Sequence, residues 1–77
     1  IGILIYNGSG VTVQNSTLTN NSSYGVAVEW FSGVPNVTIT GNTIGSSGNS
    51  NGSGVWVANE GADGVTISSN DIAYNAT

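Results

Sequence analysis

Short apolar alternations recur along the chain, and this recurrence is the strongest signal in the sequence. A glycine followed by an apolar-X-apolar triplet occurs three times, at residues 2–5, 25–28 and 54–57. Each copy is followed by a β-branched triplet with a central threonine, at residues 11–13, 37–39 and 65–67. A single apolar residue then closes each repeat: Leu18, Ile44 and Ile72. Self-similarity at a period of about 20–50 residues is typical of stacked repeat architectures.

The alternation within each repeat has period two, which predicts short β-strands with one inward-facing set of side chains. No stretch has helical periodicity, because clusters of Gly, Asn and Ser interrupt every apolar triplet. An antiparallel meander is the alternative to stacked parallel coils, but hairpins do not require residue-by-residue recurrence at this period. The predicted inward set is Ile3, Ile5, Val11, Val13, Leu18, Val26, Val28, Val37, Ile39, Ile44, Val55, Val57, Val65, Ile67 and Ile72.

We therefore expect an all-β fold, namely a parallel β-helix (β-solenoid) of three rungs with uncapped ends. The repeat glycines are 23 and 29 positions apart, and the length difference falls in the turns. The chain is a single solenoid segment, 1–77, with rungs 1–24, 25–53 and 54–77. Matching positions should form ladders along the axis. One ladder is an outward threonine column at Thr12, Thr38 and Thr66, and the other is a turn column at Ser16, Asn42 and Asn70.

The composition excludes several classes of function. The chain has no Cys, His, Lys or Arg, and its four acidic residues give a net charge of -4. Disulfides are therefore impossible, and we expect no metal and no cofactor. Nucleic-acid binding and attachment to anionic lipid both need cations, and no apolar run is long enough to cross a membrane. Abundant Gly, Asn and Ser would suit a disordered tract, but regularly placed Val and Ile argue against one.

Residues 25–28 and 36–44, with their counterparts in the other repeats, resemble rungs of the right-handed parallel β-helix of the pectate-lyase-like superfamily. The resemblance covers essentially the whole chain and implies the fold. The superfamily contains lyases, hydrolases, epimerases, phage tailspikes and surface proteins, so the resemblance leaves function open. Its lyases use an Arg or Lys base and its hydrolases use clustered Asp with a His, none of which this chain offers. We accordingly predict no catalytic residues and no enzyme activity.

The acidic and aromatic residues give weaker candidates. Paired carboxylates at Glu29 and Glu60 would suit glycoside hydrolysis, but Glu29 corresponds to Ala58 when counted from each repeat's glycine. Calcium at Glu60 and Asp63 is an alternative, and Asp71 lies apart. The aromatic candidates for a protein interface or for sugar stacking are Trp30, Phe31 and Trp56. The outward hydroxyl pairs also resemble ice-binding solenoid faces, although Gln14 interrupts the second column.

Asn-X-Ser/Thr sequons are frequent and bear on the compartment. The candidate N-glycosylation sites are Asn7, Asn15, Asn20, Asn36, Asn51 and Asn75, with Asn21 too close to Asn20 for both to be modified. Turn formation is the alternative role of these asparagines. Together with the absence of Lys, Arg and Cys, the sequons favour an extracellular or cell-surface location in a prokaryote.

These features lead to one main functional expectation and one alternative. We expect a structural, non-enzymatic protein whose rungs stack into a longer solenoid, fibre or sheath, with copies associating end to end through open β-edges. Glycans are the other expected partners, whereas nucleic acid and membrane insertion are not expected. The alternative is a fragment of a carbohydrate-active or carbohydrate-binding β-helix protein.

Overall fold

The computed structural model describes residues 1–6, 10–30, 36–59 and 64–76, and only the backbone of Trp30 and Asn59. Within these residues the chain forms nine β-strands and no helix, which confirms the predicted all-β class. The strands are β1 (Ile3–Tyr6), β2 (Thr12–Gln14), β3 (Thr17–Leu18), β4 (Tyr24–Trp30), β5 (Val37–Thr40), β6 (Thr43–Ile44), β7 (Ser53–Asn59), β8 (Val65–Ser68) and β9 (Asp71–Ile72).

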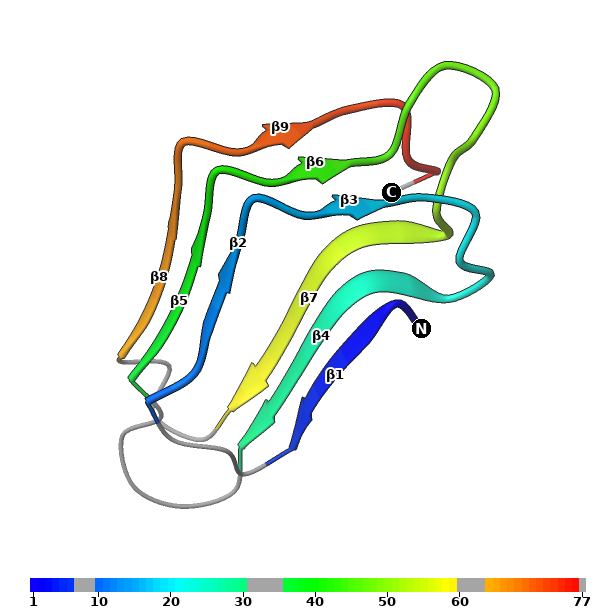
Figure 1. Ribbon diagram of the computed structural model, residues 1–77. Coiled ribbons are helices and arrows are strands. Elements are labelled where there is room, and N and C mark those ends of the chain that lie inside the picture. The colour runs from blue at the N-terminus through cyan, green and yellow to red at the C-terminus, as the bar shows by residue number, and fades with distance from the viewer. Residues whose placement is uncertain (7–9, 31–35, 60–63, 77) are drawn as a thin grey trace.

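The strands pair in parallel across three stacked rungs (Figure 1). The first sheet has the order β1-β4-β7, the second β2-β5-β8 and the third β3-β6-β9. Strands β1–β3, β4–β6 and β7–β9 thus form rungs one, two and three. The register places Val13 opposite Ile39, and Ile39 opposite Ile67, as the repeats predict. The parallel β-helix prediction is confirmed, and the antiparallel meander is wrong.

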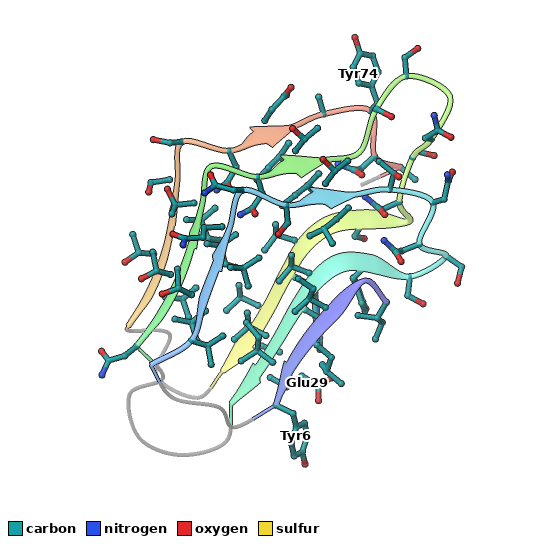
Figure 2. All side chains as sticks on the ribbon, viewed as in Figure 1. Tyr6, Glu29 and Tyr74 are labelled. Atoms are coloured by element: carbon teal, nitrogen blue, oxygen red, sulfur yellow. The ribbon has the colours of Figure 1, made fainter. Side chains whose placement is uncertain are left out.

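The core is centred on rung two, between its two neighbours. Val26, Val28, Ile39 and Ile44 are fully buried, and side chains of the three sheets point into the space that they enclose (Figure 2). Residues of the outer rungs pack against this cluster while keeping partial exposure: Ile3, Val11, Leu18, Val55 and Val65. Burial of this continuous apolar column is the main favourable term in the folding of such a solenoid.

Three residues of the predicted inward set are more exposed than expected. Val57 is 37% exposed, and Ile67 and Ile72 are each 43% exposed. They lie opposite the buried residues Val28, Ile39 and Ile44 of rung two, so they occupy the predicted columns. Rung three is an edge of every sheet, and among the described residues no strand covers its outer side. The position of these residues along the solenoid axis, rather than the orientation of their side chains, explains their greater exposure.

The glycine that opens each repeat is required by close packing between rungs. A Cβ added to Gly25 would lie 2.7 Å from Cγ2 of Ile44 and 2.8 Å from the carbonyl oxygen of Gly54. A Cβ on Gly2 would likewise lie 2.6 Å from the carbonyl oxygen of Gly25. These distances are shorter than real Cβ contacts, so the position accepts no side chain without displacing the next rung.

The corners of the solenoid are made by single residues in the left-handed backbone region. The corner before the second sheet uses Gly10, Asn36 and Gly64, and the corner between the second and third sheets uses Asn15, Gly41 and Ser69. At the corner after the third sheet, Asn20 and Tyr74 have φ values of 60°. Glycine and asparagine adopt this conformation at low cost, whereas a tyrosine does so only with strain.

Candidate functional site: two asparagine ladders and the outer surface

The predicted turn column forms a hydrogen-bonded ladder between the second and third sheets. Oδ1 of Asn42 accepts from the backbone N–H of Ser16 at 3.0 Å, and Oδ1 of Asn70 accepts from the backbone N–H of Asn42 at 3.0 Å. Nδ2 of Asn42 donates to Oδ1 of Asn70 at 2.9 Å and to the carbonyl oxygen of Val13 at 3.0 Å. Asn42 is 2% exposed, so its polar atoms are satisfied inside the fold. This first ladder confirms the prediction.

A second ladder, which the sequence did not lead us to predict, lies at the corner after the third sheet. Oδ1 of Asn51 accepts from the backbone N–H of Asn21 at 3.0 Å and from its Nδ2 at 2.8 Å. Oδ1 of Asn75 accepts from the same two groups of Asn51, at 3.2 and 2.9 Å. Nδ2 of Asn51 also donates to the carbonyl oxygen of Leu18 at 2.9 Å. Asn21, Asn51 and Asn75 therefore link all three rungs.

The second ladder was hidden by unequal spacing. Asn21 and Asn75 each follow the closing apolar residue of their repeat by three positions, whereas Asn51 follows Ile44 by seven. The extra residues contain a small turn, where Ser46 and Asn49 form an isolated antiparallel bridge. Aligning the repeats with a gap at this corner would have revealed the ladder.

The ladders change the status of the candidate glycosylation sites. Asn51 is 1% exposed, and both hydrogens of its amide are donated within the fold. An N-linked glycan replaces one of those hydrogens, so Asn51 is not available for a glycan in the folded chain. Nδ2 of Asn75 donates to the carbonyl oxygen of Ile44 at 2.9 Å, which leaves its second hydrogen.

The remaining candidate glycosylation sites lie at corners. Asn15, Asn20 and Asn36 are exposed and adopt the left-handed conformation. Nδ2 of Asn20 donates to Oδ1 of Asn49 at 3.0 Å. Asn7 lies outside the described residues. Glycosylation of these positions stays a prediction.

The aromatic candidates are only partly described. Trp56 is half-buried on the outer face of the first sheet, where Ala27 and Leu4 precede it in register. Its ring stacks on that of Tyr24, with centroids 5.0 Å apart and an angle of 13° between the planes. One face of the indole is therefore covered within the chain. Phe31 and the Trp30 side chain lie outside the described residues.

The described acidic residues do not converge. Glu29 lies on β4 opposite Ala58, as the repeat count predicted, and Asp71 lies on β9 in the third sheet. Glu29 and Tyr6 occupy neighbouring positions at the end of the first sheet, far along the strands from Tyr74 (Figure 2). Glu60 and Asp63, the calcium alternative, lie outside the described residues. Within the described ranges, no group of three acidic side chains could hold a metal ion.

The outward threonines form the expected column on the second sheet. Thr12 pairs with Thr38, and Thr38 pairs with Thr66. In the neighbouring column, Gln14 pairs with Thr40, which confirms that the second hydroxyl column is interrupted. The surface is consequently a polar strip rather than a continuous array of hydroxyl groups.

Comparison with known proteins gives the family. The family model described as right handed beta helix region matches residues 1–77, and the chain belongs to this family. No curated protein and no solved structure matches the chain. In the part of the chain that the structure describes, no helix is long and apolar enough to cross a membrane.

Proposed function

We propose that the chain is a structural, non-enzymatic protein of the extracellular space or cell surface. Its rungs stack into a longer solenoid, fibre or sheath. The observation that carries the proposal is the apolar outer side of rung three, which we call the rung-three end. It is formed by Val57, Ile67 and Ile72, each between 37% and 43% exposed and in register with buried residues of rung two.

The backbone supports the same proposal. Strands β7, β8 and β9 form one edge of the three sheets, and β1, β2 and β3 form the other. An uncovered strand edge is a template for pairing with another strand, and an adjacent apolar surface adds to the gain. A further rung on either edge would bury both. A structural role of this kind needs no catalytic group.

The surface chemistry supports an extracellular setting. The chain has no Lys or Arg, so trypsin-like proteases find no cleavage site, and it has no Cys that oxidation could alter. The exposed corner asparagines Asn15, Asn20 and Asn36 would carry glycans on the outside of the solenoid. A prokaryotic surface layer would suit this combination.

Assembly of the purified chain is the direct test. Dynamic light scattering over a concentration series should show growth of long particles, and fibre diffraction should show a meridional reflection at roughly 4.8 Å. Ile67→Lys places a charge in the rung-three end and should abolish growth. Thr66→Lys places the same charge on the outward side of the same strand and is the matched control. A wild-type chain that stays monomeric at every concentration would refute the proposal.

A carbohydrate-binding role is the second candidate, favoured by the stacked pair of Tyr24 and Trp56. A rigid, half-exposed ring can stack on a pyranose face, with Leu4 and Ala27 beside it. Titration with neutral and uronate polysaccharides, monitored by tryptophan fluorescence, tests this role against Trp56→Ala. Product analysis in the same samples tests for lyase or hydrolase activity, and turnover that Glu29→Gln abolishes would overturn the non-enzymatic proposal.

A further inference from the structure

We propose that copies of this chain add in one direction only, with rung one of each new copy docking on the rung-three end of the preceding copy. The inference rests on the proposed function and adds the polarity of assembly. It comes from the two asparagine ladders, in which every hydrogen bond that an asparagine Oδ1 accepts has the same sense along the axis.

The hydrogen bonds that Oδ1 accepts all run in one direction. At each step, the backbone N–H of a ladder residue donates to Oδ1 of the asparagine in the following rung, from Ser16 to Asn42 and from Asn21 to Asn51. The asparagine amide does the same, from Asn42 to Asn70 and from Asn51 to Asn75. In these bonds the donors point toward rung three and Oδ1 points toward rung one, while the second Nδ2 hydrogen donates back to a carbonyl oxygen of the preceding rung.

The two ends of the second ladder are consequently complementary. Within the described residues, Oδ1 of Asn21 in rung one receives no hydrogen bond, although Nδ2 of Asn21 donates to Asn51 and to the carbonyl oxygen of Thr19. At the other end, the backbone N–H of Asn75 and one Nδ2 hydrogen have no acceptor among the described residues. Rung one thus offers a hydrogen-bond acceptor, and rung three offers the donors that would fill it.

Docking rung one of a new copy on the rung-three end continues the existing pattern. Oδ1 of Asn21 in the new copy would take the two free donors of Asn75, as Oδ1 of Asn75 takes those of Asn51. In the first ladder, the backbone N–H of Asn70 would meet the hydroxyl oxygen of Ser16, which has lone pairs free to accept while it donates to Gln14. Ile3 would then follow Val55 in the first sheet, as Val55 follows Val26.

The ladders are needed to decide the direction of addition, because neither the apolar contacts nor the strand edges favour one direction. Apolar contacts are non-directional, and two identical strand edges can pair in antiparallel fashion about a two-fold axis. Rung one against rung one would bury the Asn21 oxygens of both copies without the Asn75 donors that complement them. Rung three against rung three would bury the donors of two Asn75 residues. Either arrangement leaves buried polar groups unpaired, which is costly. A head-to-tail contact does not close on itself and produces an open filament.

Mixing two chain-terminating variants tests the polarity. Ile3→Lys blocks the rung-one end and leaves the rung-three end free, whereas Ile67→Lys does the reverse. Each variant alone should be monomeric, and an equimolar mixture should form a heterodimer that grows no further. Native mass spectrometry with one variant labelled with ¹⁵N distinguishes the heterodimer from both homodimers. Thr12→Lys and Thr66→Lys carry the same charge outward on rungs one and three and should still form filaments.

The outcomes separate the two proposals. A homodimer of either variant alone would overturn the polarity while leaving stacking intact. A mixture that stays monomeric, although wild type assembles and circular dichroism shows both variants folded, would also overturn it. If a variant fails to fold, Leu18→Lys and Ile72→Lys block the same two ends through the third sheet. Failure of the wild type itself to assemble would remove the proposed function and this inference together.

Discussion

Removing the side chain of Asn42 should cost the chain a large part of its stability. Asn42 is the central residue of the first ladder and makes three side-chain hydrogen bonds of 2.9 to 3.0 Å, to Ser16, Val13 and Asn70. In Asn42→Ala all three partners lose their bond at a position that is only 2% exposed. Water therefore cannot readily replace the amide.

The expected loss can be worked out from these bonds. At about 0.5–1.5 kcal/mol for each intramolecular hydrogen bond, three bonds give roughly 1.5–4.5 kcal/mol, and unsatisfied buried partners move the value toward the upper end. A native chain of 77 residues has a free energy of unfolding of roughly 4–12 kcal/mol at the usual stability per residue. The substitution should thus remove about a third of the total or more.

Urea unfolding, followed by circular dichroism below the concentration of assembly, measures the effect. Asn70→Ala is the informative comparison, because Asn70 also makes three side-chain bonds but is itself half-buried at the edge, where water can enter the space that its amide leaves. It should cost about 1–2 kcal/mol less than Asn42→Ala. Asn49→Ala, at an exposed corner, should stay within about 0.5 kcal/mol of wild type. A loss of less than about 0.5 kcal/mol in the free energy of unfolding for Asn42→Ala would refute the reasoning.

Three further predictions concern packing and backbone. Ile39→Ala should cost about 2–5 kcal/mol in urea unfolding, because the side chain is fully buried. Ile67→Ala in the same column should cost less than half as much, and equal losses would contradict the packing described. Gly25→Ala should lower the free energy of unfolding by about 1–3 kcal/mol, since the added Cβ overlaps Ile44 and the next rung. A Tm equal to that of wild type would be inconsistent with that contact. Tyr74→Asn should raise stability by about 0.5–1 kcal/mol, because Tyr74 is 67% exposed and holds a φ of 60° that asparagine accepts; calorimetry showing a lower Tm would argue against backbone strain.

The fold was predictable because each rung repeats its neighbours. Strand positions, the parallel pairing and the register followed from the period-two alternation of residues such as Val37 and Ile39, since a solenoid places equal positions above one another. The first ladder was predictable for the same reason. The degree of burial was not, because Ile39 and Ile67 occupy equivalent positions in the sequence and differ only in how many rungs cover them.

The second ladder and the aromatic pair show what a repeat count misses. Asn51 was interpreted as a glycosylation candidate because its sequon is a local pattern, whereas its burial depends on Asn21 and Asn75 in other rungs. The stacking of Trp56 on Tyr24 joins residues that do not correspond in the repeat. Contacts of this kind depend on side-chain reach across strands, which alternation does not encode.

The parallel pairing has a consequence for how the chain folds. Every strand bonds to one that lies at least 23 residues away, so no early hairpin can form and folding should be slow for a chain of this size. Pairing β1 directly with β7 would skip rung two, and the longer loop would cost only about 0.6 kcal/mol more in closure entropy. The ladders do not distinguish the two pairings, because Asn75 of rung three presents the same acceptor and donor as Asn51. Apolar burial therefore has to keep rung two in the middle, since a skipped rung would uncover Val26, Val28 and Ile44.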